Sequence, residues 1–319
     1  MKKQRITVIF GVITIFFLLT AFAPAAEKFP ARPVDIVVPW GIGGGLDRMS
    51  RMAAPLLEKN LGVSCPVMNV TGGQGMAGLI KLNSMPADGH AMACITSGMV
   101  MQDVLGKAKL HIKDFQPICR VQMVPNFFWV QTDSPIKTVN DLINEAKKRE
   151  VTIALAINYS TEDLDIQTFN KFFKTRLKSV SYPKFGKKVA AVLGKHVEVL
   201  LEQAGDMQNY TKQNMVRPIV FMGPERMKTF PDVPCTGEMG LNESWPTNRT
   251  WIVKKGTPPE RVERLEKAWK AIYYTDEFQK FLEKEYIEDS WAGAKEMENI
   301  ILERYKTLSK AAQEIGWLK

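Results

Sequence analysis

The most informative pattern along the chain is a short apolar run, then a group of glycines, then apolar residues at helical spacing. Residues 34–39 read Val-Asp-Ile-Val-Val-Pro, and four of the five positions from 41 to 45 are glycine. This order predicts a strand, a glycine turn and a helix. The expected apolar face of that helix consists of Leu46, Met49, Ala53, Leu56 and Leu57.

A second unit of the same kind follows directly. Residues 66–70 predict a strand, Thr71–Gly78 form a glycine-rich turn, and a helix continues to about Leu82. Because the ends of parallel strands meet at one edge of a sheet, we expect the two turns to face the same crevice. A third strand, residues 91–95, leads into Thr96-Ser97-Gly98, whose hydroxyls are either ligand donors or the cap of the next helix.

The two glycine turns suit an anion. Glycine lets successive backbone N–H groups point at one place, and the start of the following helix adds partial positive charge. Such a pocket binds a carboxylate or a phosphate. An ordinary tight connection between strand and helix remains the alternative.

The rest of the chain continues to alternate between strands and helices, which predicts an α/β fold with parallel sheets. About 290 residues after removal of a leader would divide into two domains. Strands are expected at 127–130, 151–156, 179–182, 197–201, 218–222 and 251–253; helices are expected at 138–149, from about 163 to 175, at 187–193, from Pro258-Pro259 onward, and along residues 294–315.

The first 26 residues have the features of a secretory signal peptide. Lys2, Lys3 and Arg5 precede an apolar run from residue 6 to 19, and small residues follow, with Ala23 and Ala25 spaced as a cleavage motif. Cleavage is expected after Ala25 or the next alanine, which would place the protein in the periplasm. An uncleaved membrane anchor is the alternative.

The net charge restricts the class of ligand that we expect, whereas the cysteines leave the disulfide state open. The net charge of +9 falls to about +6 without the three basic residues of the leader, which favours an anionic ligand. Nucleic acid is not expected, because the basic residues are dispersed and the protein is exported. Four cysteines, Cys65, Cys94, Cys119 and Cys235, could pair or remain thiols, and their spacing does not decide between these.

No catalytic motif is apparent. The chain lacks the G-x-S-x-G and G-x-x-x-x-G-K-[ST] motifs, and its histidines, His90, His111 and His196, lack metal-ligand spacing. Gly41-x-Gly43 begins a dinucleotide fingerprint, but Leu46 stands where the third glycine belongs. We therefore expect a binding protein without cofactor or metal, not an enzyme. An exported enzyme that acts on a carboxylic acid remains the weaker alternative.

Several segments, in order along the mature chain, carry a family resemblance. They resemble the Bug-type receptors, the extracytoplasmic solute-binding proteins of tripartite tricarboxylate transporters. The segments are Phe29-Pro30-Ala31-Arg32-Pro33-Val34-x-Ile36-Val37-Val38-Pro39-x-x-x-Gly43-Gly44-Gly45-x-Asp47, Asn69-x-x-Gly72-x-Gln74-Gly75, Pro86-Ala87-Asp88-Gly89, Thr96-Ser97-Gly98, Asp114-Phe115-x-Pro117-Ile118, Ser134-Pro135-Ile136-Lys137-Thr138-x-x-Asp141-Leu142, Pro231-Asp232-Val233-Pro234 and Lys255-Gly256-Thr257-Pro258-Pro259.

The resemblance implies a type II periplasmic-binding-protein fold, in which two α/β domains close on a ligand. The first domain would comprise residues 27–126 and 223–319, and the second residues 127–222. It also implies a receptor that hands a small carboxylate-bearing solute to membrane permease subunits. We expect a monomer, and a di- or tricarboxylate or an aromatic acid as its solute. A receptor that signals to a membrane sensor fits the sequence almost as well.

The resemblance further implies which residues bind the solute. Asp47 is better interpreted as an acceptor that fixes its loop, although it could meet an amino group of the ligand. The implied residues are Trp40, Gly43, Gly44, Gly45, Asp47, Thr71, Gly73, Gln74, Gly75 and Ser97 in the first domain, and Asn158, Tyr159, Ser160, Thr161, Gln203 and Asp206 in the second.

The chain departs from the family on the second-domain side. Ile157 and Tyr159 stand where relatives have glycines, and Tyr182-Pro183-Lys184-Phe185-Gly186 replaces a glycine-rich turn. Tyr159, Phe185 and Trp40 could stack on an aromatic acid, and Lys184 could meet a second carboxylate. Packing of these side chains within their own domain is the alternative.

Overall fold

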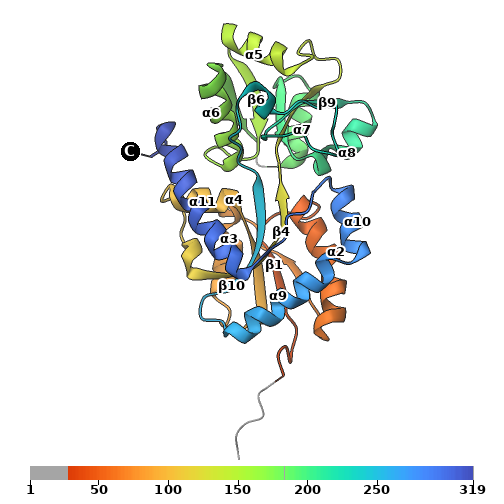
Figure 1. The fold of residues 1–319 in the computed structure, drawn as a ribbon, viewed down its shortest axis with the longest axis vertical. Coiled ribbons are helices and arrows are strands. Elements are labelled where there is room, and N and C mark those ends of the chain that lie inside the picture. Colours follow the sequence, from red (N-terminus) through yellow and green to blue (C-terminus); the bar gives the residue numbers. More distant parts are fainter. Residues whose placement is uncertain (1–27, 183, 319) are drawn as a thin grey trace, which may run out of the picture.

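The fold consists of two β-sheets, each covered by helices on both faces (Figure 1). The computed structural model describes residues 28–182 and 184–318, so the expected signal peptide lies outside the described residues. Figure 1 shows the first sheet in the lower lobe and the second in the upper lobe, with the strands β4 and β10 running between them.

The first sheet has six strands in the order β11-β4-β10-β3-β1-β2. Its strands come from two separate parts of the chain, before and after the second sheet. They are β1 (Asp35–Val38), β2 (Val67–Asn69), β3 (Ala91–Thr96), β4 (Phe115–Val124), β10 (Thr247–Lys254) and β11 (Ala292–Gly293).

The second sheet has five strands in the order β7-β6-β8-β5-β9, all from one continuous part of the chain. They are β5 (Phe127–Gln131), β6 (Val151–Leu155), β7 (Leu177–Ser181), β8 (Val199–Glu202) and β9 (Val216–Phe221). We propose that the domain boundaries lie at residues 126/127 and 222/223, where the chain passes between the sheets.

Helices pack on both faces of each sheet and bury alternate residues of the strands. In the first lobe, α2 (Gly45–Leu61), α9 (Pro259–Tyr273) and α10 (Asp276–Lys284) share one core, while η1 (Gly73–Gly75), α3 (Met76–Asn83), α4 (Ser97–Val104), η2 (Ile112–Asp114) and α11 (Ala294–Glu314) lie toward the other. In the second lobe, α5 (Val139–Lys148) and α6 (Thr161–Phe173) cover one face, and α7 (Phe185–Leu193) and α8 (Ala204–Lys212) the other; η3 (Thr236–Met239) lies in the return segment.

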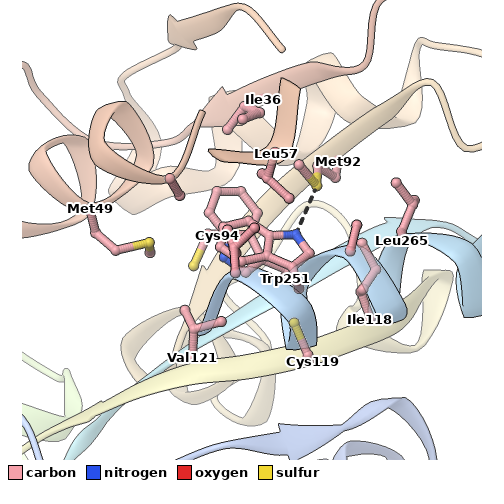
Figure 2. Close-up of a cluster of buried hydrophobic side chains, with 14 of the residues drawn as sticks. Ile36, Met49, Leu57, Met92, Cys94, Ile118, Cys119, Val121, Trp251 and Leu265 are labelled. Atoms are coloured by element: carbon pink, nitrogen blue, oxygen red, sulfur yellow. Dashed lines mark hydrogen bonds between the residues drawn. The ribbon is translucent and has the colours of Figure 1, made fainter. Parts of the chain in front are cut away.

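The core of the first lobe is built around two stacked indoles. Trp251 on β10, labelled in Figure 2, and Trp269 on α9 are buried, and their ring centroids are 4.7 Å apart. Cys94 and Cys119 lie in the same cluster. All four cysteines are buried free thiols, and burial raises the pKa of Cys94 to about 12, so they act here as small apolar side chains.

The sheets are mixed, which corrects the expectation of parallel sheets. β10 is antiparallel to β3 and β4, and β5 is antiparallel to β8 and β9. The reason is the route of the chain: β5 and β10 each enter their sheet from the side of the other lobe, whereas the neighbouring strands run toward that side. The sequence patterns also missed β4 entirely, because its alternation is interrupted by Pro117 and Arg120.

A buried carboxyl joins the two crossings between the sheets. Asp165 on α6 accepts hydrogen bonds from the Asn126 side chain at 2.7 Å and from the Trp245 backbone N–H at 2.9 Å. Asn126 lies between β4 and β5, and Trp245 just precedes β10. Burial raises the pKa of Asp165 to about 7. The two hydrogen bonds and the positive charge of the nearby Arg304 lower the pKa, but their effect is smaller than that of burial.

The titration of Asp165 should make stability depend on pH. The pKa is about 7 in the folded protein and 3.8 ordinarily, so the folded state holds the proton between these values. The free energy of unfolding should therefore fall as pH rises through this window, by up to about 1.4 kcal/mol per pH unit. Urea unfolding of the wild type and Asp165→Asn from about pH 4 to 8 measures this. Asp165→Asn should flatten the profile, and parallel profiles would contradict the assignment.

Candidate functional site

A cavity of about 180 Å³ lies between the two lobes. Its walls come from the carboxyl ends of strands and the amino ends of helices, where α/β proteins commonly bind ligands. The first lobe contributes Trp40, Gly44, Gly45, Leu46, Gln74, Thr96, Gly98, Thr247 and Arg249, and the second contributes Ala156, Ile157, Ser160, Thr161, Glu162, Gln203 and Asp206.

The glycine turn after β1 forms part of the first wall. Gly43 has a φ of +81°, a conformation that favours glycine, and Gly44 is the N-cap of α2 without a side-chain cap. The uncapped backbone N–H groups at the start of α2 are therefore near the cavity, and they carry the positive end of the helix dipole.

Asp47 holds this turn in place. Its buried carboxylate accepts hydrogen bonds from the Gly43 backbone N–H at 2.9 Å, from Arg51 Nε at 3.0 Å and from the Asn69 side chain at 2.9 Å. Burial opposes ionisation of Asp47, but these hydrogen bonds bring its pKa below the ordinary 3.8. The bond from Asn69 joins the turn after β1 to β2. Asp47 thus fixes its loop, as interpreted from the sequence.

A buried arginine lies at the same wall. Arg249 on β10 is 5% exposed and lines the cavity. Its guanidinium donates to Gln122 Oε1 and, at 2.8 Å, to Gln203 Oε1 of the second lobe. Among the described residues it forms no ion pair, and burial lowers its pKa. These bonds use two of its five N–H groups, so the guanidinium can donate to an anion in the cavity.

Gly45 makes room for this guanidinium. A Cβ added to Gly45 would lie 2.6 Å from Arg249 Nη2, closer than atoms approach without displacement. By contrast, a Cβ on Gly41 would meet nothing within 4 Å. The packing of Arg249 therefore requires a residue without a side chain at position 45, whereas nothing nearby requires one at position 41.

The second wall is built on two helix starts and two carboxylates. Ser160 is the N-cap of α6 and accepts from the Asp163 backbone N–H at 3.3 Å, so the first turn of α6 faces the cavity. Glu162 lies in that turn and Asp206 in the first turn of α8. The two walls therefore differ in charge: cationic on the side of Arg249 and anionic on the other.

Polar contacts join the lobes around the cavity. Arg48 on α2 pairs with Asp206 of the second lobe at 2.7 Å and with Glu285 of the first. Gln102 on α4 donates to the Tyr159 backbone carbonyl at 3.0 Å. Together with the Arg249–Gln203 bond, these contacts belong to a closed arrangement of the two lobes.

Half of the residues expected from the sequence line the cavity. These are Trp40, Gly44, Gly45, Gln74, Ser160, Thr161, Gln203 and Asp206; Gly43, Asp47, Thr71, Gly73, Gly75, Ser97, Asn158 and Tyr159 do not. Gly43 and Asp47 shape the turn instead, and Thr71, Gly73 and Asn158 lie outside the cavity lining. Gly75 is buried and leaves space for Met99, since a Cβ there would lie 3.0 Å from its sulfur.

Ser97 and Tyr159 have other partners. The Ser97 hydroxyl donates to the Pro246 carbonyl and accepts from the Asn248 backbone N–H, so it ties α4 to the start of β10. The Tyr159 ring packs edge-on against Trp317 at 5.1 Å, and Lys107 Nζ lies 3.8 Å from its centroid. Both side chains therefore serve the framework around the cavity.

Of the three aromatic side chains expected to stack on a solute, only Trp40 lines the cavity. Tyr159 and Phe185 do not line the cavity, and neither does Lys184. Phe185 instead pairs with Tyr210, with ring centroids 6.2 Å apart. Packing within its own lobe, the alternative left open by the sequence, applies to Phe185, whereas the Tyr159 ring packs against Trp317 of the first lobe.

Arg249 and Glu162 are the important residues that the sequence reasoning did not assign to the site. The available signal for Arg249 was one charged residue near the start of the strand Thr247–Lys254. Its burial depends on Gln122 and Gln203, more than 40 positions away along the chain. The available signal for Glu162 was its place in the first turn of α6, where an acidic residue is favourable for the helix dipole alone.

The described residues of the cavity lining include no histidine, cysteine or lysine. Across residues 28–182 and 184–318, no group of three histidine, cysteine or acidic side chains could hold a metal ion. Within the same ranges, no helix has the length and apolar character to cross a bilayer.

Curated proteins of similar sequence include a Bug protein and a UPF0065 protein. The curated protein BugT of Bordetella pertussis is 25% identical over 273 residues, which cover 81% of this chain and 82% of BugT. A UPF0065 protein of Bordetella bronchiseptica is 26% identical over 257 residues, 79% of this chain and 76% of that protein.

Solved structures share the fold. The periplasmic binding protein BugD superposes with a TM-score of 0.81 at 22% identity, covering 90% of this chain and 99% of BugD. An adipate-bound protein of R. palustris superposes with a TM-score of 0.83 at 22% identity, and the match covers 91% of this chain and 99% of that protein. The malate-bound MatC of Rhodopseudomonas palustris gives 0.76 at 19% identity, covering 89% and 99%.

The family profile described as "Tripartite tricarboxylate transporter family receptor" matches residues 49–317, which include both lobes and most of the cavity lining. The chain therefore belongs to the tripartite tricarboxylate transporter receptor family, whose members are periplasmic solute-binding proteins.

Proposed function

We propose that this protein binds a small carboxylate-bearing solute between its two lobes and delivers it to the membrane permease of a tripartite tricarboxylate transporter. The observation that carries the proposal is the buried guanidinium of Arg249, which lines the cavity and has no carboxylate partner among the described residues. A solute carboxylate would accept hydrogen bonds from the guanidinium N–H groups that Gln122 and Gln203 leave free.

The energetics of such a site are sufficient. A hydrogen bond to a charged group contributes roughly 1.5–3 kcal/mol, and micromolar binding needs about 8 kcal/mol. Arg249, the backbone N–H groups at the start of α2 and the hydroxyls of Ser160 and Thr161 offer enough donors. A cavity of about 180 Å³ suits a small acid, and the family neighbours named for adipate and malate support this solute class.

Binding would be coupled to closure. The solute touches both lobes only when they are shut, so it favours the closed arrangement over the open one. Release to a permease requires that the cross-lobe contacts of Arg48 and Gln102 break again, and partly exposed polar contacts of this kind are weak enough to allow it. We propose reversible binding without turnover, in the periplasm, after cleavage of the expected signal peptide.

The direct test is to identify the solute that co-purifies with the protein. Mass spectrometry after denaturation should reveal a small carboxylic acid, and isothermal titration should return a micromolar or tighter Kd for it. Conversion of the bound acid into another compound would favour the enzyme alternative. Failure of every carboxylate in a broad thermal-shift panel would overturn the proposal. Deletion of the gene should also abolish uptake of the solute.

Arg249→Met should weaken carboxylate binding by about tenfold to a hundredfold, because a charged donor is lost while most of the side-chain volume is kept. Isothermal titration measures the effect, and the melting temperature checks the fold. The matched control is Arg264→Met, whose guanidinium bonds to Asn60 on the surface and should leave the affinity unchanged. Equal affinities for wild type and Arg249→Met would remove Arg249 from the site.

Gly45→Ala should weaken binding by about tenfold, since the new methyl group displaces the Arg249 guanidinium. Gly41→Ala adds the same methyl group to the same turn in open space and should bind like the wild type. Titration of both variants with one carboxylate separates a steric effect on Arg249 from a general effect on the turn. The same affinity for both variants would show that Gly45 does not act through Arg249.

A further inference from the structure

The second wall of the cavity carries a carboxylate that lacks a cationic partner. Glu162 lines the cavity, and its Oε2 accepts a hydrogen bond from the Ala156 backbone N–H at 3.0 Å. It forms no ion pair with any of the described residues, whereas the neighbouring Asp206 and Glu202 do. This carboxylate therefore remains available to a donor inside the cavity.

The charged groups around Glu162 are otherwise matched. Lys188 is buried against Glu202 at 2.8 Å, so its charge is already neutralised. Arg48 is shared between Asp206, at 2.7 Å, and Glu285. With Glu162, the carboxylates are four: Glu162, Glu202, Asp206 and Glu285. The cations are three: Lys188, Arg48 and Arg249. The cavity thus has one cationic end, at Arg249, and an anionic wall opposite.

A simple dicarboxylate fits this distribution poorly. One carboxylate would be held by Arg249, but the second would meet Glu162 and Asp206, and like charges at close range in a partly dehydrated site repel. A protonated amine at the same place would be attracted by both carboxylates and could donate to them. The charges of the cavity therefore distinguish a dicarboxylate from a solute that has a carboxylate at one end and a protonated amine at the other.

We propose that the solute is a small zwitterion, with its carboxylate on Arg249 and its protonated amine facing Glu162 and Asp206. This inference rests on the proposed function and adds the class of solute. It also gives a reason for acidic side chains in the cavity of a receptor that binds an acid. The carboxylate orients the solute toward the first lobe, and the amine engages the second lobe when the lobes close.

The first experiment compares solutes matched except at one end. The purified protein, freed of co-purified solute, is titrated by calorimetry with a short series of dicarboxylates and with the ω-amino acids of the same spacing. α-Amino acids are compared with the matching 2-hydroxy acids in parallel. The best-binding amino acid should bind at least about tenfold more tightly than its partner. A dicarboxylate or hydroxy acid that binds as tightly as its amino partner would overturn the inference.

The second experiment changes only the charge of the second wall. Glu162→Gln keeps an oxygen that can accept from Ala156 but removes the negative charge. It should weaken binding of the amino acid by about tenfold and strengthen binding of the matched dicarboxylate. The control is Glu145→Gln on the exposed surface of α5, which should change neither affinity. A uniform loss for both solutes would indicate a merely structural role and would contradict the inference.

These results separate the two proposals. If dicarboxylates bind tightly and Arg249→Met abolishes their binding, the proposed function stands and the zwitterion is wrong. If no carboxylate of either series binds, the proposed function fails, and the inference fails with it. Binding of amino acids that depends on both Arg249 and Glu162 supports both.

Discussion

The buried charge of Arg249 is the constraint on which the rest of the site depends. A guanidinium taken out of water loses much of its hydration, and it is stable only where hydrogen bonds replace that loss. Gln122 and Gln203 supply neutral acceptors, Gly45 leaves the necessary space, and Asp47 holds the turn that carries Gly45. The arrangement leaves the charge of Arg249 uncompensated in its immediate contacts, and a carboxylate solute compensates it.

The same charge connects binding with closure. Gln203 belongs to the second lobe, so the hydrogen bond from Arg249 forms only when the lobes are together, as does the ion pair between Arg48 and Asp206. Each contact is modest, and together they hold the closed arrangement without making it permanent. The solute adds interactions at both walls. The difference between its affinities for the closed and the open arrangement therefore sets how far it shifts the equilibrium toward closure.

The local parts of the fold could be predicted from the sequence, because their causes are local. The glycine turn after β1 and the helices α5 and α11 follow from residue type and spacing, and the structure confirms all three. The antiparallel β5 and β10 could not be predicted in this way, since their direction is set by the path of the chain between the lobes.

The resemblance to a receptor family indicated where the cleft lies. In the candidate site, Gly44, Ser160 and Asp206 line the cavity as expected, whereas Arg249 and Glu162 were missed. The burial of Arg249 depends on neighbouring strands and distant glutamines, which no local pattern indicates.

The most direct test of the central claim is a crystal structure of the protein with its co-purified solute. The account predicts a solute carboxylate at hydrogen-bond distance, about 2.7–2.9 Å, from the guanidinium nitrogens of Arg249. A solute whose carboxylate lies away from Arg249, or a solute without a carboxylate, would contradict the account.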